Sequence, residues 1–181
     1  MSEIFTPPRP PQPADDRPRL VLDTNTVLAL WMFRDPALDA LRAWIEAGGC
    51  ELHAREDTLE ELRRVLAYRQ FGLDAAAQLA IAQHYQAHLA PAASPVEPSL
   101  ADRLARLPRC RDDDDQKFLA LACERAAHLL ITRDRALLRL ARTTRSRLGL
   151  DIVGGEVLSA ELVTGAPQTP PTGRPGIAKR A

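Results

Sequence analysis

Two short apolar segments constrain the fold of this chain more than any other feature of its sequence. Residues 19–23 (RLVLD) and 128–132 (HLLIT) are too short for core helices and indicate strands that are buried on both faces. Between and after them, apolar residues recur with helical spacing, as over residues 56–68. Strands that are separated by helices need crossover connections, which are typical of parallel sheets. The expected fold is therefore an α/β three-layer sandwich with a short parallel sheet flanked by helices.

Length and composition predict one folded domain with a tail at each end. With 181 residues, 45% of them apolar, the chain can bury one core but is short for two. Prolines gather near both ends, where apolar periodicity is lacking. We expect a proline-rich disordered tail over residues 1–18, a folded domain over 19–163 and a disordered C-terminal tail over 164–181.

Charge, cysteine usage and hydropathy together favour a cytoplasmic protein. Basic and acidic residues number 24 each, so nucleic acid can be attracted only by local clusters of charge. Three cysteines with neither a CxxC pair nor an even framework indicate buried thiols in a reducing compartment. No apolar run approaches the ~20 residues that cross a bilayer, and the N-terminus lacks an apolar signal core. We expect a cytoplasmic location and no membrane partner.

Four carboxylates are expected to converge at one edge of the sheet. Asp23 and Asp134 each come directly after an apolar strand, and open parallel sheets bind ligands beyond the carboxyl ends of their strands. Asp115 lies in the first turn of a predicted helix, on the side that turns inward. Glu61 lies at the border of the apolar stripe of residues 56–68, so the pattern places it least directly. The four side chains predict one acidic crevice.

Such a group of carboxylates predicts a bound divalent cation. Without one, the four groups would repel each other and raise each other's pKa values. Oxygen ligands with no histidine or cysteine at ligand spacing favour Mg²⁺ or Mn²⁺ over Zn²⁺. In phosphodiester cleavage such ions activate a bound water, orient it for in-line attack and stabilise the leaving oxygen. No nucleophilic side chain is then required.

Each of these features also has an ordinary structural interpretation. Asp23 and Asp134 could cap a turn or helix, and Glu61 could lie on a solvated helix face. The aspartates at 112–115 could form a solvated cluster that the helix dipole favours. The four histidines are scattered, and we interpret them as structural. Six arginines over residues 133–147 could form a charged helix face or could grip RNA phosphates, and the candidates for RNA binding are Arg133, Arg135 and Arg139.

Four segments, taken in order, resemble the PIN-domain family. They are LVLDTN (20–25), LEELRRVL (59–66), CRDDDDQKFLALA (110–122) and LITRDRALL (130–138). Together they cover roughly residues 19–163, and they resemble in particular the branch described as toxin components of toxin–antitoxin systems. Each motif alone is weakly specific, whereas the ordered set of four is strong.

The resemblance implies a small parallel-sheet fold and an RNA-cleaving endoribonuclease that uses Mg²⁺ or Mn²⁺ and is restrained by a cognate antitoxin protein. Members of the family often form homodimers, although this sequence does not fix the oligomeric state. Transferred position by position, the catalytic and metal-binding residues are Asp23, Glu61, Asp115 and Asp134. The side chains expected to support these ligands are those of Asn25, Thr132, Asp112 and Asp114. The run of aspartates leaves Asp114 as an alternative to Asp115.

Two other functions are compatible with parts of the sequence. A HAD-like phosphatase opens with D-x-D-x-T/V after an apolar strand, which residues 23–27 (DTNTV) resemble. Its acid catalysis needs a titratable group where this chain has Asn25, and no lysine lies in a convincing loop before the later aspartates. The second alternative is a non-catalytic PIN module that binds RNA or a partner with a degenerate metal site. The presence of all four carboxylates argues against it.

Overall fold

The computed structural model describes residues 17–91 and 100–165, and its centre is a four-stranded sheet. The strands run in the order β2-β1-β3-β4, and every neighbouring pair is parallel. Their bounds are Arg19–Leu22 for β1, Glu51–His53 for β2, Leu129–Ile131 for β3 and Asp151–Val153 for β4. The predicted α/β fold with a short parallel sheet is confirmed.

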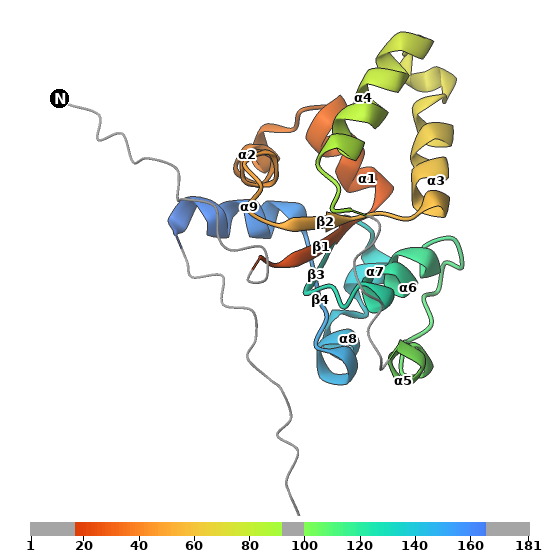
Figure 1. Cartoon of the computed structure of the whole chain (residues 1–181), viewed down its shortest axis with the longest axis vertical. Helices are drawn as coiled ribbons and strands as arrows, with labels where there is room; N and C mark the ends of the chain where they lie inside the picture. The colour runs from red at the N-terminus through yellow and green to blue at the C-terminus, as the bar shows by residue number, and fades with distance from the viewer. Residues whose placement is uncertain (1–16, 92–99, 166–181) are drawn as a thin grey trace, which may run out of the picture.

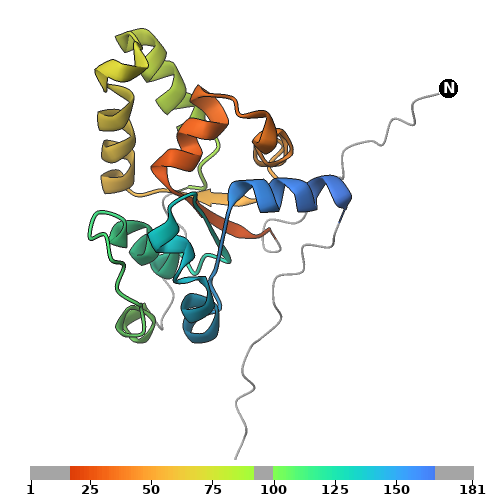
Figure 2. The ribbon, with the colours of Figure 1, turned by 180° about the vertical axis from the view of Figure 1, so that it is seen from behind.

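Helices cover both faces of this sheet (Figures 1 and 2). One side carries α1 (Thr24–Val27), the π-helical turn η2 (Leu28–Met32), the 3-10 turn η3 (Pro36–Leu38), α2 (Asp39–Glu46), α3 (Glu56–Leu66), the 3-10 turn η4 (Arg69–Phe71), α4 (Ala75–Ala87) and α9 (Gly155–Thr164). The other side carries α5 (Leu100–Ala105), α6 (Gln116–Glu124), α7 (Arg135–Leu138) and α8 (Ala141–Leu148). The result is the three-layer arrangement expected when crossover helices connect parallel strands.

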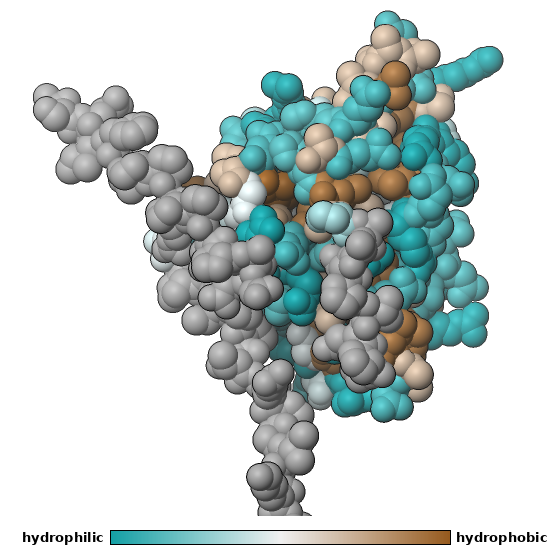
Figure 3. All heavy atoms as spheres, viewed as in Figure 1, coloured by the Kyte–Doolittle hydropathy of each residue, from teal (hydrophilic) through white to brown (hydrophobic). Residues whose placement is uncertain are grey.

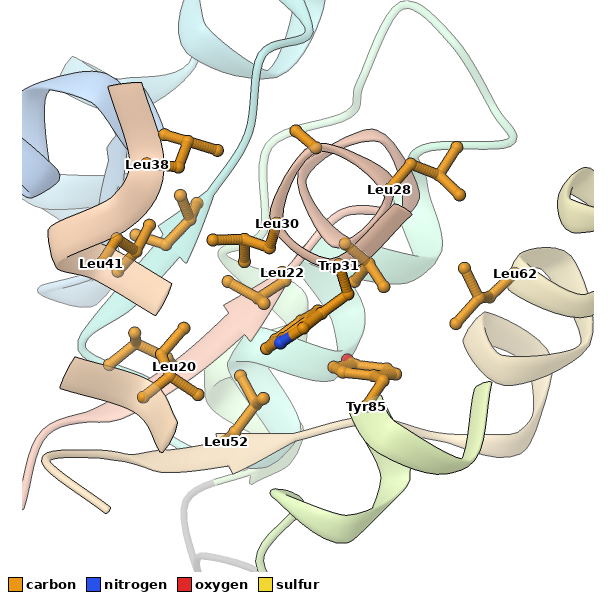
Figure 4. Close-up of a cluster of buried hydrophobic side chains, with 14 of the residues drawn as sticks. Leu20, Leu22, Leu28, Leu30, Trp31, Leu38, Leu41, Leu52, Leu62 and Tyr85 are labelled. Carbon is orange, nitrogen blue, oxygen red and sulfur yellow. The ribbon is translucent and has the colours of Figure 1, made fainter. Parts of the chain in front are cut away.

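Successive side chains of β1 point to opposite faces of the sheet and so contribute to two separate halves of the core. Leu20 and Leu22 pack into the cluster beneath α1 to α4 and α9, whereas Val21 points into the cluster beneath α6 and α8. Figure 4 shows the first cluster, in which Trp31 and Tyr85 lie side by side above the strands. After the partly exposed Arg19, both faces of β1 are buried through Leu20, Val21 and Leu22, and the first polar side chain that follows is Asp23.

The strand order positions the edge at which function is expected. From β1 the chain moves to β2 on one side and later returns to β3 on the other, so the winding reverses between β1 and β3. All four strands end at the same edge because they are parallel, and we call it the carboxyl edge. Ligands of open α/β sheets bind at such a reversal.

Local sequence explains most helix boundaries, with a few differences from expectation. Asp74 caps α4 by accepting a hydrogen bond from the backbone N of Ala77 at 2.7 Å. The sequence after Asp134 predicts one helix over residues 136–141, whereas the structure has the end of α7 and the start of α8 there. Helix α5 was not expected from the sequence. The predicted tails fall mostly on residues 1–16 and 166–181, which lie outside the described residues. The stretch from Pro91 to Pro98 predicts a linker, and all of it except Pro91 also lies outside the described residues.

The three cysteines are free and buried, as their spacing predicted. The surface seen in Figure 3 is mainly hydrophilic, with apolar side chains between the polar ones. In residues 17–91 and 100–165, no helix has both the length and the apolar character needed to cross a membrane.

Candidate functional site

Asp23 is the buried carboxylate at the centre of the carboxyl edge. It follows β1 directly, and its backbone N donates to the carbonyl oxygen of Ile131 at 3.1 Å. Its Oδ1 accepts from the backbone N of Thr26 at 2.6 Å, which makes it the N-cap of α1. The side chain is only 3% exposed, and burial raises its pKa even though hydrogen bonds from Thr132 and Thr26 lower it. Asp23 therefore caps α1, as one interpretation of the sequence predicts, and its buried second oxygen keeps it a candidate for the site.

Thr132 links Asp23 to the segment that contains Asp134. Its hydroxyl donates to Oδ2 of Asp23 and accepts from the backbone N of Asp134 at 2.9 Å. Asp134 in turn caps α7, because its Oδ1 accepts from the backbone N of Ala136 and of Leu137. The hydroxyl of the fully buried Thr132 thus links the carboxylate of Asp23 to the backbone at Asp134.

Asp115 faces the same group from the start of α6. It occupies the N-cap position of α6, but its side chain makes no capping hydrogen bond, so its oxygens are not used by the helix. Burial, and after it the negative charges of Asp134, Asp112, Asp23 and Glu61, together raise the pKa of Asp115 to about 6. Four chain segments therefore bring their carboxylates within electrostatic range of one another.

Glu61 reaches this group from the middle of α3. Its carboxylate forms an ion pair with Lys117 on α6, and both side chains are largely buried. The pair connects two helices that lie on opposite faces of the sheet. Lys117 was not expected from the sequence. Two unusual features of the sequence could have marked Lys117. A cation in the first turn of a helix is unfavourable to the helix dipole, and nearly all basic residues of this chain are arginines.

The residues predicted to support the carboxylates differ in how closely they contact them. Asp112 contributes charge to Asp115, but its side chain is exposed and accepts from the backbone N of Asp114 at 3.0 Å. Asp114 is also exposed, whereas Asp115 is half-buried, so the geometry favours Asp115 as the inward-facing aspartate. Asn25 is exposed on α1 and makes no side-chain hydrogen bond to a described residue. Of the predicted supporting side chains, Thr132 has the strongest structural connection to the carboxylates.

The three arginines proposed for RNA binding differ in what they contact. Arg133 forms ion pairs with Asp35 at 2.5 Å and with Glu156 at 2.6 Å, so two carboxylates already neutralise its charge. Arg135 and Arg139 are exposed on and just after α7, and neither is ion-paired with another described residue. The structure therefore leaves Arg135 and Arg139, but not Arg133, in a state suited to bind phosphate.

Tyr85 and Thr24 are further neighbours that sequence patterns did not indicate. Tyr85 on α4 is buried, and burial together with the charge of Asp23 raises its pKa. The hydroxyl of Thr24, next to Asp23 in the chain, is buried and has no hydrogen-bond partner in the described part of the chain. Nothing in local periodicity distinguishes these two from ordinary core and cap residues.

The donor set fits a hard divalent cation. The carboxylates of Asp115 and Asp134 retain oxygen lone pairs that no described helix cap consumes, and Asp23 adds a third carboxylate at the same edge. Oxygen-only ligands favour Mg²⁺ or Mn²⁺, and neighbouring carboxylates contribute to the raised pKa of Asp115. The arrangement can bind a cation and hold a phosphodiester beside it.

A family model described as PIN domain matches residues 19–136 of the chain, which is more than half of its length. The matched segment begins with β1, ends in α7 and includes Asp23, Glu61, Asp115 and Asp134, the carboxylates within electrostatic range of one another. Comparisons with curated proteins and with solved structures gave no match.

Proposed function

The chain belongs to the PIN-domain family, whose members are generally metal-dependent nucleases, and on this premise we propose that it is an endoribonuclease dependent on Mg²⁺ or Mn²⁺. The observation that supports the proposal best is the half-buried carboxylate of Asp115, which faces three other carboxylates and lacks a capping role. Such a cluster destabilises the folded chain unless a cation binds there.

Each carboxylate has a distinct part in this proposal. Asp23, Asp115 and Asp134 would hold the ion, and Glu61 would complete the acidic group from α3. Such an ion would lower the pKa of a bound water and stabilise the leaving oxygen. Thr132 keeps Asp23 and Asp134 oriented through its two hydrogen bonds. Lys117 fixes Glu61 in place through their ion pair.

The biological role within this proposal is that of a toxin in a toxin–antitoxin pair. A cognate antitoxin would restrain cleavage, the enzyme would act on RNA in the cytoplasm, and a homodimer is the expected assembly. The support is the sequence resemblance to that branch of the family. We likewise propose that residues 19–163 form the nuclease domain, close to the end of α9 at Thr164.

The alternatives are less well supported. A HAD-like phosphatase would need an acid in place of Asn25, and the family match favours the PIN fold instead. A non-catalytic PIN module that binds RNA would leave four converging carboxylates without a chemical task. Metal-dependent cleavage of RNA distinguishes the nuclease from both alternatives.

The direct test is cleavage of a mixed RNA pool by the untagged full-length protein in EDTA, Mg²⁺ or Mn²⁺. We expect cutting with either ion and none in EDTA. An Asp23→Asn preparation purified in parallel detects contaminating ribonucleases, because these would cut in both samples. Metal binding without any cutting would replace the proposed nuclease with the non-catalytic module.

RNA binding should depend on Arg135 and Arg139. In an Asp23→Asn background with Mg²⁺, replacing both by glutamine is expected to weaken binding of single-stranded RNA. The slope of log affinity against log salt should become shallower by about 0.7 per lost phosphate contact. The matched control replaces two exposed arginines of the α3–η4 region, Arg64 and Arg69. Equal slopes for both double variants would assign Arg135 and Arg139 to a solvated face only.

A further inference from the structure

A second group of metal-binding side chains lies outside the acidic site. It consists of Glu46, the last residue of α2, and of His84 and His88 at the C-terminal end of α4. One ligand atom from each residue can be chosen so that all three lie within 4.8 Å of one another. The two histidines are four residues apart, which places them on one face of the helix end. Glu46 is 38 positions away in sequence, so the group exists only through tertiary packing.

Trp31 contacts members of this group through a hydrogen bond and through ring contacts. Its indole Nε1 donates to Oε1 of Glu46 at 3.0 Å, and the same oxygen lies 3.1 Å from Nε2 of His84. The ring of His88 stacks on the indole at a centroid distance of 6.3 Å and an angle of 10°. Trp31 is itself almost fully buried and packs on Tyr85 (Figure 4). The carboxylate is thus fixed by a hydrogen bond to its own oxygen, as ligands of metal sites commonly are.

The group lies at the opposite edge of the sheet from the four carboxylates. Glu46 ends the helix that precedes β2, and His88 comes just before Leu89, which pairs in parallel with Leu52 of β2. Both positions therefore lie near the start of a strand, whereas the acidic site lies beyond strand ends. A pocket of about 260 Å³ borders Glu46, His88 and Glu51 at this edge.

We propose that Glu46, His84 and His88 bind one transition-metal ion, with Zn²⁺ as the ion to test first. Two imidazoles and one carboxylate are a donor set that suits zinc, with three protein ligands and a fourth position for water. At bond lengths of about 2.0–2.1 Å, tetrahedral donors lie about 3.4 Å apart. Rotation of side chains that are partly exposed can close the remaining gap.

The expected consequence is a link between α2 and α4 over the indole of Trp31. Helix α4 packs on the core mainly through Ile81, Ala82 and Tyr85, while its C-terminal end with His84 and His88 is more exposed. An ion shared by α2 and α4 would hold its C-terminal end in place. This inference does not depend on the proposed nuclease activity. Mg²⁺ prefers oxygen ligands and therefore would not compete for the histidines.

The test is a Zn²⁺ titration of the untagged full-length protein after metal removal, followed by calorimetry, with Co²⁺ absorption as a second readout. It is done in the Asp23→Asn variant, which weakens the acidic site. We expect one equivalent of Zn²⁺ per chain. Replacing His84 and His88 together by glutamine should weaken this binding by at least about 100-fold. Glu161→Gln, which changes an exposed carboxylate on α9, is the control and should bind as the parent does.

A second ligand variant, Glu46→Gln, distinguishes loss of a ligand from loss of the local fold. In Glu46→Gln the amide oxygen can still accept the hydrogen bond from Trp31, so the local fold should persist. We expect Zn²⁺ binding about 10- to 100-fold weaker, with an unchanged circular dichroism spectrum. No Zn²⁺ binding by the parent, or parent-like affinity in both ligand variants, would overturn the proposal. Loss of RNA cleavage in any of these proteins has no bearing on the outcome.

Discussion

Replacing Asp23 by asparagine is expected to reduce metal-dependent RNA cleavage by roughly 10²- to 10³-fold while the protein stays folded. The change removes one negative charge from the proposed ion site and keeps the volume of the side chain. A bound ion contributes several kcal/mol of charge stabilisation in such reactions, and each 1.36 kcal/mol corresponds to about tenfold in rate. The measurement is the initial rate on the same RNA at several concentrations of Mg²⁺.

The fold should tolerate this substitution for a specific reason. Asparagine is as good an N-cap as aspartate, so the hydrogen bond from the backbone N of Thr26 can persist. On the other side, the hydroxyl of Thr132 would have to accept from the amide instead of donating to a carboxylate, which costs about 1 kcal/mol. Burial favours the neutral amide and offsets part of this cost.

A matched control isolates the ion site from the helix cap. Asp74 caps α4 through a hydrogen bond to Ala77, as Asp23 caps α1, but it is exposed and lies outside the group of carboxylates. Asp74→Asn therefore makes the same chemical change without touching the proposed ligands. Parent-like cleavage by Asp23→Asn, or an equal loss in Asp74→Asn, would remove Asp23 from the proposed mechanism.

Sequence reasoning was strongest where a local pattern determines a position in space. Asp23 and Asp134 follow buried strands, and the strands are parallel, so both had to emerge at one edge. The inward side of α6 followed from the apolar residues after Asp115 in the same way. These placements need only the periods of strands and helices.

The rest depended on contacts between distant segments. Glu61 lies at the border of a helical stripe, and only the packing of α3 near α6 brings it to Lys117. Arg133 looks like its neighbours in a run of arginines, but Asp35 and Glu156 engage it from far away in sequence. The same limit applies to the interpretation of the histidines as purely structural. His84 and His88 come near a shared carboxylate only because the fold brings Glu46, at the end of α2, to within 3.1 Å of His84 on α4.

Replacing Asp115 by asparagine is expected to stabilise the metal-free protein near neutral pH while abolishing cleavage. The carboxylate lies among other carboxylates, and its pKa in the folded chain is raised to about 6 from an ordinary value of 3.8. Between about pH 4 and pH 6 the folded chain therefore holds more protons than the unfolded chain, and its free energy of unfolding falls as pH rises. Above pH 6 this loss is complete.

The magnitude is modest because water screens this half-buried side chain. We expect Asp115→Asn to raise the free energy of unfolding in EDTA at pH 7 by about 1 kcal/mol, which shifts Tm by about 2–4 °C for a chain of this size. The decline in stability between pH 4 and pH 6 should become shallower. It should not vanish, because the pKa of Asp23 is also raised by burial and contributes with the same sign.

Thermal melts across pH 4 to 8, in EDTA and in Mg²⁺, check this prediction. In Mg²⁺ the order should reverse, because the parent gains stability from the ion and the variant loses a ligand for it. Asp114→Asn is the control, since Asp114 is the exposed neighbour in the same run and the alternative ligand. If Asp114→Asn rather than Asp115→Asn raised stability in EDTA and lost the response to Mg²⁺, Asp114 would be the third ligand. A stabilised, inactive Asp115→Asn protein would mean that this acidic edge sacrifices stability of the free chain for the ability to bind its ion.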